Sequence, residues 1–387
     1  MPKRRHPAST CLMALLFATT VAGAAQTDGH LTVTLAPGFD SNPLELPDVS
    51  LTEPKGAWYT ELGLDAGLGI RLNQVVGFVM DLDGATRSFG SEASDADRGW
   101  ADASAAIRLT PWRSGDRGLA VAAGATAGVY RSTYIDPATG ETYLMFDGSE
   151  DVPLPDRFDY NSAGAFVDLR FIAHRRLLLY LDSALGRRRY VESYDPLLPS
   201  LDDRFMSFEP GVLVEVTPWM TIDISYAWSD RKYDELEAVD PNAAEVPGER
   251  RAYHDDGASV TIGFEPQEKL QFAIGYSTTA REDLHAGYYD NAGSTAFGSV
   301  SFAAGAKTRL NAFVARRDLA YETATVDNTV NGETLDSART MFVGRAEHDL
   351  SDHFVVFGEA GKDKSENRDP LFTYDRTWAH AGLRFRL

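Results

Sequence analysis

The sequence predicts an all-β fold, namely a transmembrane antiparallel up-and-down β-barrel of about 16 strands, within a range of 14 to 18. Two observations lead to this prediction. Apolar and polar residues alternate through many segments of about ten residues, which is the length that crosses a bilayer when tilted. Short connections between these segments also alternate with long, acidic ones. Because hydrocarbon offers no partner to backbone N–H and C=O groups, such strands must close into a barrel. A soluble sandwich would bury its apolar rows and would seldom need so many long strands.

The N-terminus has the composition of a secretory signal peptide. Basic residues at positions 3–5 precede an apolar core from Cys11 to Val21, and small residues follow at positions 22–25. This core is too short to be a stable membrane helix. We therefore predict that residues 1–25 are removed and that residues 26–387 form a single outer-membrane barrel domain. Cys11 is the only cysteine, so disulfides cannot hold the mature chain together.

Composition narrows the classes of protein that remain. The 387 residues carry a formal net charge of −20, which argues against a nucleic-acid partner. The predicted mature chain contains no apolar run of about 18 residues, so no transmembrane helix is expected there.

The segment Phe208–Trp228 illustrates the alternation. An apolar row and a polar row run to Thr217, the chain turns at Pro218, and two alternating rows resume from Met220. We therefore predict a β-hairpin here. The same pattern predicts these arms in order: Leu31–Leu35, Trp58–Leu72, Val76–Asp83, Ala101–Leu109, Leu119–Tyr130, Ala163–Phe171, Leu177–Tyr190, Phe208–Thr217, Met220–Trp228, Ala258–Phe264, Leu270–Tyr276, 296–305, 308–321, 338–349, 353–364 and 374–387.

The lengths of the connections predict which end of the barrel faces the outside of the cell and which faces the periplasm. Long connections, including loops around residues 84–97, 134–157 and 234–250, are expected to alternate along the chain with very short turns. Outer-membrane barrels place long loops outside the cell and short turns in the periplasm. An even number of strands then puts both termini on the periplasmic side. We expect the six Trp residues to form two interfacial girdles. These are Trp58, Trp100, Trp112, Trp219, Trp228 and Trp378.

The polar rows carry charges of both signs, and these are the candidate functional residues. On a lipid-facing row each Arg would cost about 2–4 kcal/mol at mid-membrane, so the charged rows are expected to face the lumen. A polar pore with opposed acidic and basic clusters is one interpretation, and an ion-paired network that fills the barrel is the other. The predicted lumen-lining charges are Glu61, Asp65, Arg71, Asp81, Asp102, Arg108, Asp168, Arg170, Asp182, Arg188, Glu209, Glu215, Asp223, Arg281, Arg309 and Arg345.

Two short segments resemble known outer-membrane proteins. In the last strand, Ala379, Ala381, Leu383 and Phe385 alternate with polar residues, and the segment resembles the signal that the outer-membrane assembly machinery recognises. Such signals usually end in Phe, whereas this chain ends in Leu387. The segment Gly38-Phe39-Asp40-Ser41-Asn42 is similar to one in β-barrel porins of the second type and in related export barrels. The resemblance implies an outer-membrane pore or export barrel in a Gram-negative bacterium.

No pattern of catalytic residues stands out, so we predict that the chain is not an enzyme and has no cofactor or metal site. The most suggestive cluster, His254-Asp255-Asp256, is expected at an outer loop end and lacks a third ligand at usable spacing.

Three functional hypotheses follow. The first is a passive channel for small hydrophilic solutes. The second is an export or assembly barrel that handles a polysaccharide or surface protein with periplasmic partners. The third is a barrel enzyme or an adhesin. In each case outer-membrane lipids, lipopolysaccharide and the assembly machinery are the expected partners. The loop Tyr134–Asp156 is the best candidate for a constriction in the lumen.

Overall fold

The computed structural model describes residues 26–387 apart from residues 48, 51–52, 54, 92, 136–143, 147–150, 154–155, 192–198 and 327–331. The predicted signal peptide, residues 1–25, lies outside the described residues. Most of the candidate constricting loop does so too, and its role stays a prediction.

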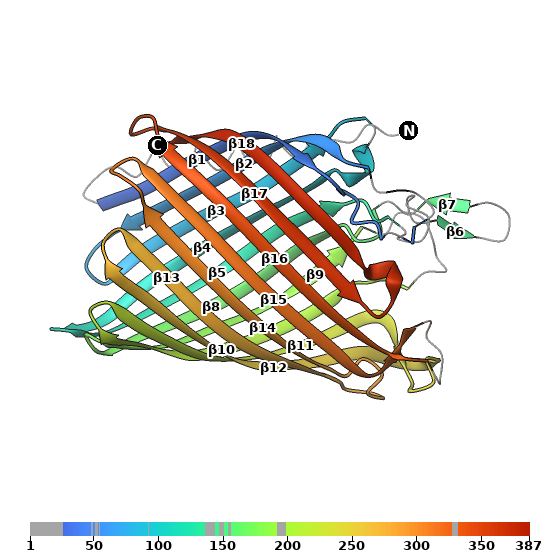
Figure 1. The fold of residues 1–387 in the computed structure, drawn as a ribbon. Coiled ribbons are helices and arrows are strands. Elements are labelled where there is room, and N and C mark those ends of the chain that lie inside the picture. The colour runs from blue at the N-terminus through green and yellow to red at the C-terminus, as the bar shows by residue number, and fades with distance from the viewer. Residues whose placement is uncertain are drawn as a thin grey trace.

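Sixteen antiparallel strands close into one barrel, in which each strand pairs with its neighbours in the chain and the last pairs with the first (Figure 1). The predicted fold class and strand number are therefore confirmed. The barrel strands are β1 (Gln26–Asp40), β2 (Ala57–Arg71), β3 (Val76–Phe89), β4 (Arg98–Ser114), β5 (Arg117–Ser132), β8 (Tyr160–His174), β9 (Leu177–Tyr190), β10 (Asp203–Thr217), β11 (Met220–Val239), β12 (Glu245–Gln267), β13 (Leu270–Asp283), β14 (Asn291–Ala303), β15 (Thr308–Thr325), β16 (Thr334–Asp349), β17 (Phe354–Asn367) and β18 (Tyr374–Arg386).

Other regular structure in the described residues is short. Strands β6 (Leu144–Phe146) and β7 (Asp151–Pro153) pair as a separate two-stranded sheet. The 3-10 helices η2 (Ser94–Ala96) and η4 (Pro370–Phe372) each lie in a connection between strands. Among the described residues, no helix has the length and apolar character needed to cross a membrane.

The outer face of the barrel is apolar and is exposed. Ile107 is 54% exposed, Leu185 60% and Ile274 52%, and all three lie on the rows opposite to the charged rows. Exposed apolar area on this scale marks an interaction surface. A closed barrel whose long strands are apolar outside and polar inside is the design that a lipid bilayer requires. The chain is thus an outer-membrane β-barrel.

Only part of the predicted aromatic arrangement agrees with the strand register. Trp112 stacks on Phe171 and Trp219 stacks on Phe264, both on outward rows near the short turns. Trp100, however, shares the row of Asp102 and lies opposite Tyr130, and Trp378 shares the row of Arg376 and His380. The prediction that these two belong to the girdles was wrong, because both lie on inner rows. The sequence position of a Trp near a strand end does not show which face of the barrel it occupies.

The two ends of the barrel differ in their connections (Figure 1). Tight turns such as Ser114–Arg117 lie at one end, together with the C-terminal residue Leu387 and the start of β1. The long connections lie at the other end. The predicted loop at 234–250 was too long, because β11 and β12 continue to Val239 and from Glu245 as strands of 20 and 23 residues and leave only residues 240–244 between them. About ten residues suffice to cross the bilayer, so this hairpin projects beyond it.

A buried ion pair joins the first and last strands at the long-loop end. Asp40 on β1 is fully buried, and its carboxylate accepts hydrogen bonds from Nε and Nη2 of Arg376 on β18 at 2.9 and 2.6 Å. The Arg376 side chain is only 7% exposed, and its Nη1 also donates to Glu45 at 2.5 Å. Nε also donates to the second Asp40 oxygen, Oδ1, at 3.1 Å, so three carboxylate oxygens satisfy one guanidinium across the seam where the barrel closes.

The connection after β1 lies against the inner face of the wall. Asn42 closes a tight turn, since its side-chain amide donates to the Leu46 carbonyl and accepts from the Leu46 N–H. Leu44 packs on the buried cluster that contains Tyr59 and Phe89, both on inward rows. The Gly38–Asn42 segment that resembles other outer-membrane barrels therefore has a structural role here, which is to fix the seam.

Gly38 is the position in this segment where a side chain has no room. A Cβ there would lie 2.5 Å from Cζ of Tyr59 and 2.7 Å from Cβ of His380, and these two side chains share a hydrogen bond of 2.9 Å. We expect Gly38→Ala to lower stability by about 1–3 kcal/mol through overpacking. Denaturant unfolding of the refolded barrel measures this. Gly358→Ala is the matched control because a Cβ added there would have no neighbour within 4 Å. Equal stability of the two variants would contradict the packing argument.

Candidate functional site: the charged inner wall

The strand register places all sixteen candidate charges on rows opposite to the exposed apolar rows. The acidic and basic residues share this inner face with many glycines, alanines and serines. They are distributed as follows: Glu61, Asp65 and Arg71 on β2, Asp81 on β3, Asp102 and Arg108 on β4, Asp168 and Arg170 on β8, Asp182 and Arg188 on β9, Glu209 and Glu215 on β10, Asp223 on β11, Arg281 on β13, Arg309 on β15 and Arg345 on β16.

One continuous row of directly paired residues runs across neighbouring strands, with its arginines at one end and its carboxylates at the other. From β2 to β10 its directly paired residues are Arg71, Gly77, Arg108, Ala122, Asp168, Asp182 and Glu209. We call this the charge row. Its last three members are carboxylates on three adjacent strands. Like charges directly opposite each other destabilise a sheet, so this arrangement costs stability.

Few partners relieve the repulsion in the charge row. Arg170 donates to Asp182 at 2.5 Å, and the Ser225 hydroxyl donates to Glu209 at 2.9 Å. Arg170 and Asp182 still keep 37% and 39% of their side-chain surface exposed. Charges on the inner face are therefore in contact with solvent.

A second row, nearer the long loops, also has three carboxylates on three adjacent strands. Asp65, Asp83 and Asp102 are directly opposite one another on β2, β3 and β4. His30 Nε2 lies 2.7 Å from Asp65. Asp83 was missing from the predicted candidates although it obeys the same alternation, which was a usable signal. Among the described residues, no group of three or more His, Cys, Asp or Glu side chains has the arrangement of a metal site.

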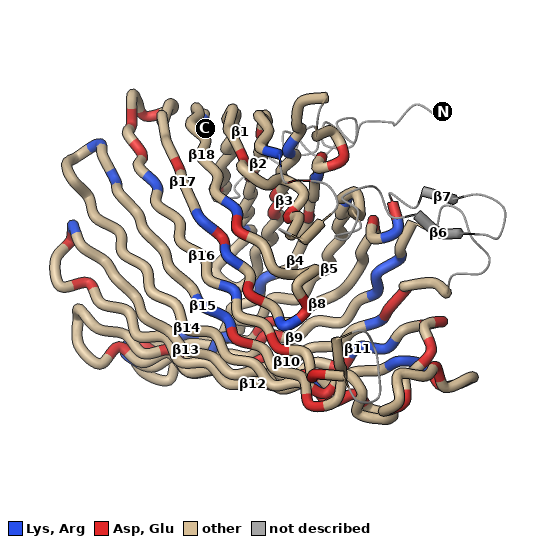
Figure 2. Tube along the Cα trace, turned by 45° about the vertical axis from the view of Figure 1, so that its right-hand side comes forward, with Lys and Arg blue, Asp and Glu red and all other residues tan. Residues whose placement is uncertain are grey.

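Strands β15–β18 form a wall that is dominated by arginine. In the closed order this wall is separated from β8–β11 by β12–β14 on one side and by β1–β5 on the other. Arg345 contacts Glu347 at 2.8 Å and Glu359 at 3.3 Å, and Arg384 contacts Glu347 at 3.1 Å. Several guanidinium groups therefore share few carboxylates. Figure 2 shows charged segments along β16–β18 as well as near β9–β11.

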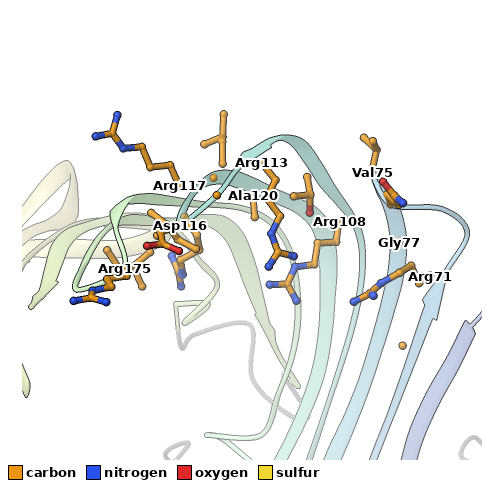
Figure 3. A pocket seen from close by; sticks show the side chains of 18 of the residues that line it. Arg71, Val75, Gly77, Arg108, Arg113, Asp116, Arg117, Ala120 and Arg175 are labelled. Atoms are coloured by element: carbon orange, nitrogen blue, oxygen red, sulfur yellow. The ribbon is translucent and has the colours of Figure 1, made fainter. Parts of the chain in front are cut away.

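The short-turn mouth holds a cavity of about 1190 Å³ with an unusual number of arginines in its lining. We call it the arginine vestibule and define it by Arg71, Arg108, Arg113, Arg170, Arg175 and Arg176. Its acidic lining residues are Asp28, Asp116 and Glu215. In Figure 3, Arg71 on β2 and Arg108 and Arg113 on β4 extend toward the same space, whereas the side chain of Arg117, which also lines the cavity, extends in another direction.

Sequence reasoning missed Arg113 for an identifiable reason. Simple alternation from Arg108 would put Arg113 on the outer face. The register shifts between Leu109 and Trp112, however, and Arg113 pairs with Gly118 on the inner side of this irregularity. A β-bulge inserts a residue and reverses the facing of all that follows. Pro111, inside this irregularity, was a usable signal, because proline within a sheet is confined to edge strands, strand starts and bulges.

The suggested His254-Asp255-Asp256 cluster is not a cluster in space. It lies within β12 rather than at a loop end, so that prediction of its position was wrong. Alternation sends Asp255 inward, where Arg281 donates to it at 2.6 Å. His254 lies on the outer row and contacts Asp230 at 2.9 Å. Similarly, of three consecutive arginines only Arg188 shares the inner row, where it lies 3.3 Å from Asp203.

Comparison with known proteins adds little. No protein-family model matches the chain, and no curated protein matches it. Among solved structures it is similar to a loop-deletion mutant of OmpT, an outer membrane protein of Vibrio cholerae, and to an anion-selective porin from Comamonas acidovorans, each at 10% identity and a TM-score of 0.47. A mutant porin of Rh. blastica has 13% identity and a TM-score of 0.36. Each match covers 94% of this chain and 100% of the other. All three TM-scores are below 0.5, and the fold follows from this chain's own strand pairing.

Proposed function

We propose that the protein is a porin-like channel through which small hydrophilic solutes cross the outer membrane passively. The observation that supports this best is the solvent exposure of charges on the inner face. Asp65 keeps 53% of its side-chain surface exposed, and Arg170 and Asp182 keep 37% and 39%. A barrel filled by a packed core would bury such groups, since unpaired buried charge is costly. Barrels of 16 to 18 strands commonly enclose an aqueous channel.

The proposed selectivity comes from charge on the inner wall. Carboxylates gather on β8–β11 and guanidinium groups on β15–β18 and in the arginine vestibule. Opposed charges across a narrow aqueous path create a transverse field that orients and sorts polar solutes. Permeation then needs no cofactor and no bond chemistry.

Planar-bilayer recording tests the proposal. Purified, folded protein is expected to insert in discrete conductance steps, because each barrel adds one water-filled path. Heat-unfolded protein at the same detergent concentration is the control and should give none. Insertion confirmed by protease protection, yet without any step in current, would contradict the channel and favour the filled, ion-paired barrel.

A further inference from the structure

We propose that the arginine vestibule binds a small multivalent oxyanion, of the class of phosphate esters or pyrophosphate, at the short-turn mouth of the barrel. The binding itself requires only the folded barrel. Its effect on ion current rests on the proposed channel function. A failure of anion binding and a failure of the channel function can therefore be distinguished by experiment.

Four guanidinium groups of the vestibule form no ion pair with the carboxylates of the described residues, although Asp28 and Asp116 also line the cavity. Within the described part of the chain, Arg71, Arg108, Arg113 and Arg175 have no acidic group within 4.0 Å, whereas Arg170 and Arg176 contact Asp182 and Glu215. The chain as a whole has a net charge of −20, so general attraction of anions is not expected. A concentrated positive site in an acidic protein is thus a local feature of this mouth.

The strand register brings three of these groups to one place. Arg71 and Arg108 are separated in the charge row only by Gly77. Two strand spacings of about 4.8 Å put their backbones roughly 10 Å apart, within reach of two extended arginine side chains that bind one ligand from both sides. Arg113 extends toward the same space because of the bulge after Leu109 (Figure 3).

The residue type indicates which anion fits. A guanidinium presents a planar fork of N–H donors that matches the paired oxygens of phosphate or carboxylate, and it gains no such match from a spherical halide. Several forks around a cavity of about 1190 Å³ can contact several oxygens of one ligand at once. A multivalent oxyanion is therefore favoured over chloride.

The test is calorimetric titration of inorganic pyrophosphate into the detergent-solubilised barrel at low ionic strength. We expect saturable binding, and a loss of about tenfold or more in affinity for the double variant Arg71→Gln/Arg108→Gln, since two solvated charge contacts are removed. The control is the double variant Lys269→Gln/Lys307→Gln, which removes two positive charges from other short turns at the same mouth, at residues that do not line the cavity. Its affinity should match that of the wild-type protein.

Two outcomes would overturn the proposal. One is the absence of saturable pyrophosphate binding to the wild-type barrel. The other is an equal loss of affinity in Lys269→Gln/Lys307→Gln, which would indicate diffuse attraction rather than a site. Glutamine keeps the length and polarity of the side chain, and retained heat-modifiable mobility on gels shows that each variant is folded.

A second measurement separates this proposal from the channel. Pyrophosphate added on the short-turn side is expected to reduce single-channel current at lower concentration than when it is added on the other side, and the double variant should lose this difference. A barrel that gives no current contradicts the channel, while the titration still decides whether the vestibule binds the anion.

Discussion

Replacing Arg376 with methionine is expected to lower the free energy of unfolding by about 3–5 kcal/mol, because removal of one partner leaves the other charge buried without compensation. Asp40 is fully buried and receives two hydrogen bonds from this guanidinium, which also contacts Glu45. Urea unfolding followed by tryptophan fluorescence measures the change. The effect should be the largest of any single arginine substitution proposed for this barrel.

Two further variants make the result interpretable. Arg316→Met removes an arginine that also pairs with a carboxylate, Asp318, at 2.9 Å, but both side chains are at least half exposed. Exposed pairs contribute about 0–1 kcal/mol, so this control should be nearly neutral. The double variant Asp40→Leu/Arg376→Met should recover much of the lost stability, because no charge is then left buried. Equal losses for Arg376→Met and Arg316→Met would contradict the seam as a stabilising contact.

Neutralising two of the three carboxylates in the charge row is expected to lower the cation-to-anion permeability ratio. In Asp168→Asn/Glu209→Gln, the contact between Arg170 and Asp182 and the hydrogen bond from Ser225 can both remain. A focused field raises local counter-ion concentration by tenfold or more, so we expect a fall in the ratio of roughly tenfold at low salt. At 1 M salt the Debye length is about 3 Å and the change should largely vanish. Reversal potentials across a salt gradient measure the ratio.

The matched control for this experiment is Asp318→Asn, which also removes a carboxylate but from an outward row of β15. Its reversal potential should equal that of the wild-type protein. If the inner-wall variant also left the reversal potential unchanged at low salt, the carboxylates of the charge row would not face the conducting path.

The architecture could be predicted because it follows from one repeating constraint. Each strand must present apolar residues to lipid and avoid unpaired backbone groups, so alternation and connection length reveal strands such as Trp58–Leu72 and the turn at Pro218. These signals are local in sequence. They therefore also assign the charged rows to the face opposite the apolar rows.

What could not be predicted depends on contacts between distant residues or on single irregularities. The bulge after Leu109 changes the facing of Arg113; Pro111 marks an irregularity there, but the number of residues by which the register shifts depends on the pairing with β5. Trp100 and Trp378 were misplaced because aromatic residues suit both the interface and a half-buried inner wall. The partnership of Asp40 with Arg376 joins residues 336 positions apart, and no local pattern connects them.

That separation has a consequence for how the barrel selects its own geometry. A sheet of this kind could in principle close with a different number of strands, or with its last strand shifted by two residues, and still satisfy the backbone and the bilayer. Only one pairing of β1 with β18 brings Arg376 beside Asp40, with Asp40 opposite Trp378. A closure that separates these two residues deprives the buried Asp40 carboxylate of this cation, so the ion pair favours the observed circumference and shear together. Closure must also wait for the final thirteen-residue strand to be present.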